Sequence, residues 1–457
     1  STINIEWVCT MKLEKFKEKD TKKRFIVIFT VCCILLLAGV FLYTSFAVFT
    51  EDKNFNVING TYQDPGDIYF AYYVDGQITR NLPTQDSGYM LDEESSNCTN
   101  GVVPSWDYSK WRFIGDYSGY TTTDYSRTKC NLYFTKTKTV STVLGDLDVY
   151  TYTPDFTKSA CDDATCESHE KGIFETTDDD GTSYYYRGSV ENNYVYFANC
   201  YWRIIRINGN GSIRMIYDGT VAHANGEASD DRQVGTSRFN PAQNDNMYLG
   251  YMYISGNVHG TGTSSVIKQA NDNFYTSVLS SYVSYIDTNV GFCGDRSTLN
   301  GQSGVGTGTT STYMKGYVRV ATSTPSLTCE NSSDLYTVSS SNKGNKALTY
   351  PVGLITADEV MLSGSSGGFF DRNYNYQKGA LNSYLTTGNH FWTMTPVGYY
   401  NPFDITDWGA RLFYMNTSGN IDDGSANGTL ALRPVINIRS NVTVSGDGTI
   451  SSPYEFS

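Results

Sequence analysis

An uncharged apolar run near the N-terminus limits what this chain can fold into more than any other feature does. No charged residue occurs from Phe25 to Phe49, and Ile, Val, Leu and Phe make up most of the run. A helix of that length spans about 37 Å at ~1.5 Å per residue, whereas the hydrocarbon core of a bilayer is about 30 Å thick. We therefore expect residues 25–49 to form one transmembrane helix that contacts the lipid bilayer.

Charges on the two sides of this run predict its orientation. Residues 1–24 are rich in Lys and Arg, whereas Glu51 and Asp52 follow the run. Basic residues stay on the cytoplasmic side of a membrane, so we expect a cytoplasmic tail and an extracellular remainder. The expected location is a plasma membrane crossed once. A cleaved signal peptide remains an alternative, because Ser45 and Ala47 are small residues at positions that suit a signal peptidase.

The overall charge limits the kinds of partner. The chain has a net charge of −13, and because residues 1–24 are basic, the remainder is more acidic still. An acidic surface repels phosphate, which argues against nucleic acid as a partner. The 37 Tyr and 42 Gly residues favour a β-rich exterior, because Tyr is common in strands and Gly in turns.

The cysteines suggest disulfide bonds, which an extracellular location permits. Pairing neighbours along the chain is the simplest prediction, although sequence alone does not prove connectivity. It gives Cys98–Cys130, Cys161–Cys166 and Cys293–Cys329. Cys200 is then left unpaired within an apolar strand, where a small buried side chain is expected.

Metal and cofactor sites are not expected. Cys161, Cys166 and His169 are three possible ligands, but no fourth follows at the spacing of a zinc site. The run Asp178-Asp179-Asp180 lacks the ligand pattern of a calcium loop, and we interpret it as a solvated loop.

Composition changes along the chain predict the domain organisation. A stalk leaves the membrane, a small module with two Trp and one disulfide follows, and a Thr- and Asp-rich linker leads to one large domain. The expected ranges are 1–24 for the cytoplasmic tail, 25–49 for the transmembrane helix, 50–72 for the stalk, 73–135 for the β-rich disulfide module, 136–182 for the linker and 183–457 for the large domain.

The large domain shows both strand and helix signals. Asn208-Gly209-Asn210-Gly211 joins two apolar stretches, 194–207 and 212–217, and predicts a hairpin. Apolar residues recur at helical spacing over 264–286. Thr356 followed by Glu359 predicts a capping box that opens a short helix. Two helices among many strands indicate an α+β fold.

Four motifs carry a resemblance to a known family. They are Cys200–Ile207 (CYWRIIRI), Leu354–Val360 (LITADEV), Phe391–Pro396 (FWTMTP) and Leu432–Ile438 (LRPVINI). In this order they resemble an uncharacterised domain family of surface proteins of gut Gram-positive bacteria. The resemblance covers about residues 184–456. It implies a C-type-lectin-like fold, shared with formylglycine-generating enzymes, and says little about the ligand.

Two departures limit what the resemblance implies. Calcium-dependent sugar-binding lectins carry Glu-Pro-Asn or Gln-Pro-Asp together with Trp-Asn-Asp, and none of these tripeptides occurs here. Formylglycine-generating enzymes need reactive cysteines deep in the C-terminal half, and no Cys follows Cys329. We therefore expect neither activity.

No catalytic residue is predicted. The sequence has no P-loop, G-x-G-x-x-G or H-E-x-x-H motif, and its four His are scattered. Paired carboxylates such as Asp404 with Asp407 leave one alternative open, an enzyme acting on cell-wall or host polysaccharide.

Ligand binding is the preferred hypothesis. Polar and aromatic residues between the two closing motifs would form an exposed face in the implied fold, and such side chains give contact area and adaptable hydrogen bonds. Trp392 and Phe413 are instead expected in the core. The predicted ligand-binding residues are Tyr399, Tyr400, Asn401, Asp404 and Asn420. The partner is an unidentified extracellular protein or glycan, and the predicted role is that of an adhesin or receptor.

Overall fold

The computed structural model describes the chain from residue 68 onward, with gaps. The described ranges are 68–84, 88–107, 110–119, 128–136, 139–140, 148–160, 171–299, 301–308, 310–365, 383–401 and 408–457. The predicted tail, transmembrane helix and most of the stalk lie outside these ranges, as do Cys161, Cys166 and His169. In the described ranges, no helix has the length and apolarity needed to cross a membrane. The described fold is mostly β-sheet with few helices.

The small module is built on one central strand, β7. Its odd and even residues alternate in burial, and Cys130, Leu132 and Phe134 point into the core. β1 pairs with β7 in parallel, whereas β3 and β4 pair with it antiparallel. The strands are β1 (Tyr69–Val74), β2 (Gln77–Thr79), β3 (Tyr89–Leu91), β4 (Asn97–Cys98), β5 (Trp106–Asp107), β6 (Arg112–Phe113) and β7 (Lys129–Lys136).

Two predictions for this module can be compared with the structure. The Cys98–Cys130 disulfide is confirmed and joins β4 to β7. The predicted module start at residue 73 is wrong, because β1 begins at Tyr69, within the predicted stalk. The reason is packing: the Phe70 ring meets Phe113 with centroids 5.0 Å apart, so the strand belongs to the core.

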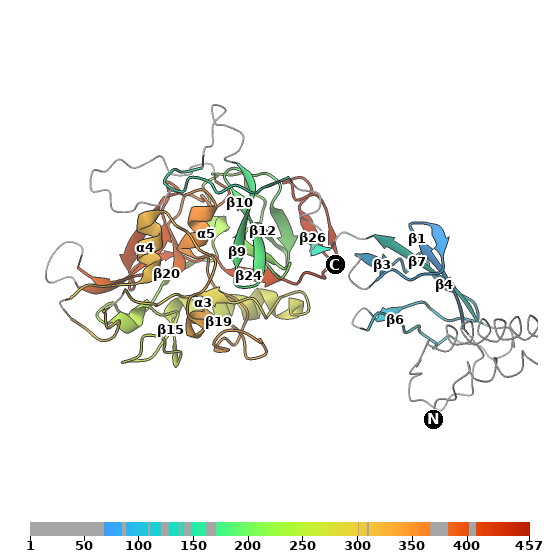
Figure 1. The fold of residues 1–457 in the computed structure, drawn as a ribbon, viewed down its shortest axis with the longest axis horizontal. Coiled ribbons are helices and arrows are strands. Elements are labelled where there is room, and N and C mark those ends of the chain that lie inside the picture. The colour runs from blue at the N-terminus through green and yellow to red at the C-terminus, as the bar shows by residue number, and fades with distance from the viewer. Residues whose placement is uncertain are drawn as a thin grey trace, which may run out of the picture. The chain divides into compact units, whose positions relative to one another are not determined.

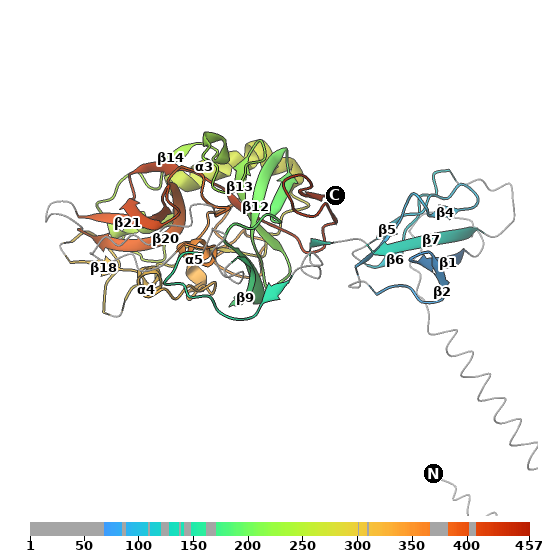
Figure 2. The same cartoon turned by 90° about the horizontal axis from the view of Figure 1, so that it is seen from above.

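The large domain holds two sheets, which Figure 1 shows from the front and Figure 2 from above. Within the described ranges, nine strands form the first sheet in the order β25-β26-β11-β12-β10-β9-β8, with β13 and β24 continuing from β12. These strands are β8 (Val149–Tyr150), β9 (Gly172–Asp178), β10 (Gly181–Arg187), β11 (Tyr194–Phe197), β12 (Cys200–Ile207), β13 (Ile213–Gly219), β24 (Val435–Ile438), β25 (Val444–Ser445) and β26 (Tyr454–Phe456).

The second sheet is centred on β20. Six strands of the described chain belong to it, in the order β14-β23-β20-β21-β22 with β18 also paired to β20. These strands are β14 (Thr236–Arg238), β18 (Thr312–Tyr313), β20 (Phe391–Tyr400), β21 (Gly409–Met415), β22 (Ile421–Ser425) and β23 (Thr429–Ala431). Among the described residues of this domain, two short antiparallel pairs lie outside both sheets: β15 (Met252–Tyr253) with β16 (Thr263–Ser264), and β17 (Phe292–Cys293) with β19 (Leu335–Tyr336).

The helices lie on both sides of the sheets. Figures 1 and 2 place α3 (Val266–Phe274) on one side and α4 (Lys315–Thr322) with α5 (Ala357–Leu362) on the other. A π-helical turn (Tyr275–Leu279) and a 3-10 turn (Ser280–Tyr282) extend α3, which confirms most of the helix predicted over 264–286. The capping box of α5 is also confirmed, with Thr356 Oγ1 accepting from Glu359 N at 3.1 Å. α4 was not predicted, because Gly, Ser and Thr dominate the segment before it.

The hairpin turns follow the local sequence. The predicted hairpin at 208–211 is confirmed and joins β12 to β13. The apolar stretch 194–207 is two strands rather than one, because Ala198 and Asn199 adopt positive φ angles of 55° and 59° and reverse the chain between β11 and β12. Asn is one of the few residues that tolerate this conformation.

The predicted linker over 136–182 is wrong in its described part. β8 and β9 belong to the first sheet, and Ile173 and Phe174 are buried in the main core. Polar residues at the solvent-facing positions of β9 gave this segment a linker-like composition. The run that begins at Asp178 is likewise not simply a solvated loop, because Asp178 is buried and pairs with Arg206 at 2.6 Å. The large domain therefore begins before residue 183.

Loss of the Cys98–Cys130 bridge should destabilise the small module. We expect Cys98→Ser to lower the free energy of unfolding by about 2–5 kcal/mol, the usual cost of removing a native disulfide from a small extracellular domain. Thermal unfolding followed by circular dichroism measures the change. Cys200→Ala is the control, because Cys200 is a buried free thiol that closes no loop. An equal loss in both variants, or peptide mapping that links Cys98 elsewhere, contradicts the prediction.

Candidate functional site

The predicted ligand-binding residues that the structure describes do not share one environment. Tyr399 and Tyr400 end β20 and are only 3% and 5% exposed, so the prediction that they form an exposed face is wrong. All ten residues of β20 are buried, because neighbouring strands and the helices α4 and α5 cover this central strand. Asn401 is half-buried just after β20. Asp404 lies outside the described residues.

Asn420 lies away from the other predicted residues. β20 and β21 run antiparallel, with Tyr400 opposite Gly409 and Phe391 opposite Met415. Asn420 lies in the turn that follows β21, at the far end of that strand from Tyr400. A strand of this length spans roughly 20 Å at ~3.3 Å per residue. The structure therefore does not bring Asn420 together with the other predicted residues that it describes. Trp392 and Phe413 are buried in the core, as predicted.

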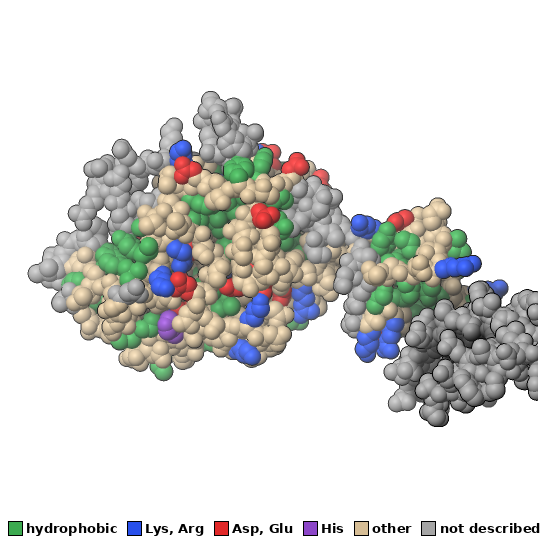
Figure 3. Space-filling view, in the orientation of Figure 1, with side chains coloured by type: hydrophobic (Ala, Val, Ile, Leu, Met, Phe, Trp, Pro, Cys, Tyr) green, Lys and Arg blue, Asp and Glu red, His purple; other side chains and the backbone are tan. Residues whose placement is uncertain are grey.

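Half-buried aromatic rings do gather beside the end of β20. The rings of Tyr313 and Tyr317 stack with centroids 4.5 Å apart and an interplanar angle of 26°. Tyr400 packs under Tyr313, with ring centroids 5.2 Å apart. We call Tyr313, Tyr317 and Tyr400 the tyrosine patch. Figure 3 shows hydrophobic side chains at the surface over this end of the domain, beside α4.

Buried polar contacts hold the base of the tyrosine patch. The Tyr400 hydroxyl donates to Asp423 Oδ2 at 2.5 Å, and Arg411 forms an ion pair with the same carboxylate. Arg411 also donates to Ser425 Oγ at 3.2 Å. Burial and the Asp423 carboxylate raise the pKa of Tyr400 well above its usual value. This hydroxyl is therefore a fixed hydrogen-bond donor at any physiological pH.

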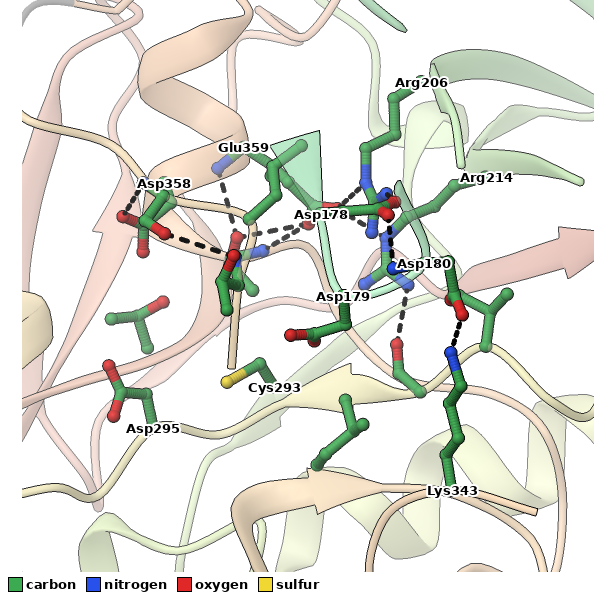
Figure 4. A pocket seen from close by; sticks show the side chains of 18 of the residues that line it. Asp178, Asp179, Asp180, Arg206, Arg214, Cys293, Asp295, Lys343, Asp358 and Glu359 are labelled. Carbon is green, nitrogen blue, oxygen red and sulfur yellow. Dashed lines mark hydrogen bonds and ion pairs between the residues drawn. The ribbon is translucent and has the colours of Figure 1, made fainter. Parts of the chain in front are cut away.

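A charged cavity lies on the same side of the domain. It has a volume of about 40 Å³ and is lined from β9, β12, β13, α4, α5 and the loops near the Cys293–Cys329 disulfide (Figure 4). That disulfide is present, as predicted. The charged residues that line the cavity are Asp178, Asp179, Asp180, Asp295, Asp358, Glu359, Arg206, Arg214, Arg319 and Lys343.

The inner wall of the charged cavity is a network of buried ion pairs. Arg206 pairs with Asp178 at 2.6 Å and with Glu359 at 3.0 Å. Arg214 pairs with the same Glu359 oxygen at 2.6 Å. Glu359 also closes the capping box of α5 through Thr356. Two guanidinium groups thus balance two carboxylates in this part of the wall.

A second group of charges centres on Arg319 of α4. Its guanidinium holds Asp358 through two hydrogen bonds of 2.7 and 2.9 Å, and it pairs with Asp295 Oδ2 at 2.6 Å. Asp295 is only 3% exposed, and its Oδ1 atom is buried without a hydrogen-bond partner. One guanidinium therefore faces two carboxylates, and Asp295 Oδ1 accepts no hydrogen bond.

The mouth of the charged cavity is exposed. Asp180 forms an ion pair with Lys343, shown as a dashed line in Figure 4. Asp179 is exposed and accepts a hydrogen bond from Cys329 N at 3.1 Å. Ser326 and Thr328 are exposed as well. The cavity thus opens to solvent between the β9–β10 turn and the disulfide-linked segment.

The electrostatics of two carboxyls follow from these neighbours. Burial opposes ionisation of Glu359, but the guanidinium groups of Arg214 and Arg206 outweigh it and hold the pKa below its usual range. Burial raises the pKa of Asp295, although Arg319 opposes the rise. Glu359 is therefore a stable structural anion, whereas the charge on Asp295 is poorly compensated.

Sequence reasoning missed the charged cavity. The sequence held one signal of buried ion pairs: Arg203 and Arg206 lie in an otherwise apolar strand. A buried Arg needs a buried acceptor. The acceptors lie far away in the chain, with Glu359 more than a hundred residues from Arg206. No pattern along the sequence could have identified them.

The described part of the chain contains no group of side chains that could bind a metal ion. There, no three side chains among His, Cys, Asp and Glu are placed to hold a metal ion.

Comparison of the chain with protein-family models, with curated proteins and with solved structures found no match.

The lowered pKa of Glu359 predicts how stability changes with pH. Its folded pKa lies below the ordinary value of 4.5, so the ionised carboxylate stabilises the fold above that pH. This contribution is lost as pH falls through the folded pKa. We expect Glu359→Gln to cost about 3–5 kcal/mol at neutral pH, since it leaves two buried guanidinium groups undercompensated.

The variant should also lose less further stability than the wild type below pH 4.5. Urea unfolding at several pH values measures both effects. Glu455→Gln is the control, because Glu455 is an exposed carboxylate on β26. The same pH dependence in wild type and Glu359→Gln contradicts the assignment.

Proposed function

We propose that this protein is a membrane-anchored extracellular ligand-binding protein of a bacterial cell surface, comparable in role to an adhesin or receptor. The observation that carries the proposal is the tyrosine patch, in which two half-buried stacked rings rest on a buried, hydrogen-bonded support. The ligand is an extracellular protein or a glycan. Residues 25–49 supply the anchor, and the acidic exterior argues against nucleic acid as a partner.

Tyrosine rings suit this role for physical reasons. A tyrosine offers a large amphipathic surface with few rotatable bonds, so little entropy is lost when it contacts a ligand. Stacking between Tyr313 and Tyr317 restricts both rings further. The Tyr400–Asp423–Arg411 contacts beneath them fix the backbone of β20. A preorganised aromatic surface of this kind is typical of binding hot spots.

We also propose a C-type-lectin-like fold for the large domain. Support comes from the four motifs, whose residues lie mainly in the buried strands β12, β20 and β24 and in the short helix α5. A β-rich domain with few helices is compatible with that fold. The family resemblance concerns the framework of the domain and leaves the ligand open.

The polysaccharide-acting enzyme is the weaker alternative. The charged cavity contains several carboxylates, but its volume of about 40 Å³ does not admit a sugar ring. Ligand pockets are typically about 300–1,000 Å³. Most of its carboxylates are also held by Arg or Lys. A general acid and base need access to substrate, so this geometry favours binding.

The membrane anchor predicts which peptides intact cells expose. Trypsin added to whole cells should release peptides from the region around Lys315 and Lys343, because everything after residue 52 is expected outside. Mass spectrometry of the released peptides measures this. Recovery of these peptides only after cell lysis contradicts the topology. Release of the whole extracellular part without protease supports the cleaved signal peptide instead.

The tyrosine patch predicts a variant that loses binding but keeps its fold. We expect Tyr317→Ala in the full chain to weaken binding to an array-identified protein or glycan by about 2 kcal/mol, or roughly 30-fold. Its melting temperature should stay near that of the wild type, because Tyr317 is half-buried. Tyr400→Ala should instead destabilise the domain, since Tyr400 is 5% exposed and bonded to Asp423.

A matched control lies on the other sheet. Tyr201 of β12 is also half-buried and packs against another tyrosine, Tyr196, with ring centroids 5.0 Å apart and an interplanar angle of 56°. Tyr201→Ala should leave binding unchanged. Equal loss of binding in Tyr201→Ala and Tyr317→Ala, or full binding by Tyr317→Ala, removes the tyrosine patch as the ligand site.

A further inference from the structure

The sheet of the small module has a face that the core of the module does not use. Successive residues of a strand point to opposite faces of a sheet. Phe70, Tyr72 and Val74 of β1 pack against the core, so the residues between them belong to the opposite face. The residues of β1 and β7 on that opposite face are Tyr69, Ala71, Tyr73, Lys129, Asn131, Tyr133 and Thr135.

A row of apolar side chains crosses this face. Tyr73 lies opposite Tyr133 on one side and opposite Ile78 of β2 on the other. The Tyr73 and Tyr133 rings stack with centroids 4.4 Å apart and an interplanar angle of 14°. Ile78 is 70% exposed, and Tyr69, further along β1, is 41% exposed. We call Tyr69, Tyr73, Ile78 and Tyr133 the module face. Scattered apolar residues are ordinary on a protein surface, but a contiguous row marks a contact site.

The charge beside the module face is basic. Lys129 lies opposite Tyr69 and is exposed. Among the described residues that strand pairing places on this side of the sheet, none is acidic. The whole chain, in contrast, has a net charge of −13. An anionic surface therefore attracts this side of the module, whereas it repels an acidic exterior.

The place of the module in the chain determines which surface it can reach. Residues 50–68 separate the predicted transmembrane helix from β1. Even a fully extended chain of that length spans at most about 70 Å, at ~3.3–3.6 Å per residue. The membrane therefore stays within reach of the module at an effective concentration on the order of 1 mM. At that concentration a weak contact is populated, and a freely diffusing partner lacks this advantage.

We propose that the module face is a docking surface for the phospholipid bilayer that holds the protein. This inference rests on the membrane anchor of the proposed function and adds a second contact with the same bilayer. Ile78 enters the boundary between headgroups and acyl chains. The tyrosine rings lie at the level of the headgroups, which suits their apolar bodies and polar hydroxyls. Lys129 contacts the lipid phosphates.

A second copy of the chain fits the module face less well. A symmetric dimer would bring together two surfaces that carry Lys129 and no acidic partner, and like charges oppose such pairing. A stable protein interface also buries about 800 Å² on each partner. Four side chains, of which Tyr73 and Tyr133 are half-buried, expose less than that. A bilayer needs no such area, because the anchor already holds the module near it.

A photoactivatable lipid tests the docking directly. The full chain is reconstituted in nanodiscs of phosphatidylcholine and phosphatidylglycerol, with a phospholipid that carries a diazirine near the glycerol end of one acyl chain. After illumination, mass spectrometry of digested protein locates the labelled residues. We expect label on residues 69–78 and on Tyr133, besides residues 25–49. Absence of label from both parts of the module face overturns the proposal.

Variants identify the side chains that make the contact. Ile78→Ser should lower the labelling of the module face at least about threefold, and it should fold because Ile78 is 70% exposed. Lys129→Gln should lower it about fivefold with phosphatidylglycerol present and leave it unchanged in phosphatidylcholine alone. Val103→Ser is the matched control, since Val103 is an aliphatic residue of the same module, 57% exposed and bridged to Asp116 outside this sheet. Wild-type labelling in Ile78→Ser and Lys129→Gln, or an equal loss in Val103→Ser, overturns the proposal.

Three further outcomes separate this inference from the anchor and from dimerisation. Label on residues 25–49 but not on the module face overturns the docking and leaves the anchor standing. Label on the module face but not on residues 25–49 supports the docking and counts against the anchor. A dimer in detergent micelles that Ile78→Ser dissociates, as measured by analytical ultracentrifugation, overturns the assignment to lipid.

Discussion

The large domain depends on one buried carboxylate, Asp218, which three arginines surround. Asp218 Oδ1 accepts from Arg232 Nε at 2.9 Å and from Arg433 at 2.8 Å, and Arg203 lies 3.9 Å from the other oxygen. All four side chains are 0–1% exposed. Arg232 and Arg433 also donate to backbone carbonyls, whereas Arg203 donates to the side-chain oxygens of Asn193 and Asn225 and to Val190 O. The centre of the Tyr194 ring lies 3.6 Å from the Arg203 guanidinium. Burial lowers the pKa of Arg433 to about 9, because one carboxylate and the surrounding oxygens compensate three guanidinium groups only in part. Removing one partner from such a cluster leaves charges that the interior cannot solvate. The backbone carbonyls that accept hydrogen bonds from Arg232 and Arg433 belong to Tyr217, Ala224, Glu227, Tyr384, Leu385 and Thr386.

This arrangement explains what the sequence motifs encode. Arg203 belongs to the first motif and Arg433 to the last, and they meet around Asp218, which lies in neither. Glu359 of the middle motif pairs with Arg206 of the first in the same way. The motifs therefore specify long-range ion pairs that fasten β12, α5 and the segment before β24 together. A resemblance based on them concerns the framework, and ligand residues are free to differ between proteins that share it.

Local features were predictable from sequence, and long-range ones were not. The turn at 208–211, the capping box at Thr356 and Glu359, and two neighbour-paired disulfides were correct because a few adjacent residues determine each of them. Asp178 was misassigned because a carboxylate gives no sign along the chain of whether an arginine will reach it. Tyr399 and Tyr400 were misassigned for another reason. Exposure was expected from the fold that the resemblance implies, but β20 has strands beside it and helices over it, so both faces of the strand are buried.

Helix α4 is the element that links the tyrosine patch to the charged cavity. Tyr317 and Arg319 are two residues apart on a helix, so they point in different directions from its axis. One contributes a ring to the patch and the other holds Asp295 and Asp358. The helix itself can shift little, because Gly316 packs against β20 so closely that a Cβ there would lie 2.5 Å from Thr395 Cγ2. Arg319 adds a second restraint by joining α4 to α5 through Asp358. The tyrosine patch and the charged cavity are therefore held at a fixed separation by the same short helix. Fixed spacing of this kind lets a protein discriminate among ligands by geometry as well as by charge.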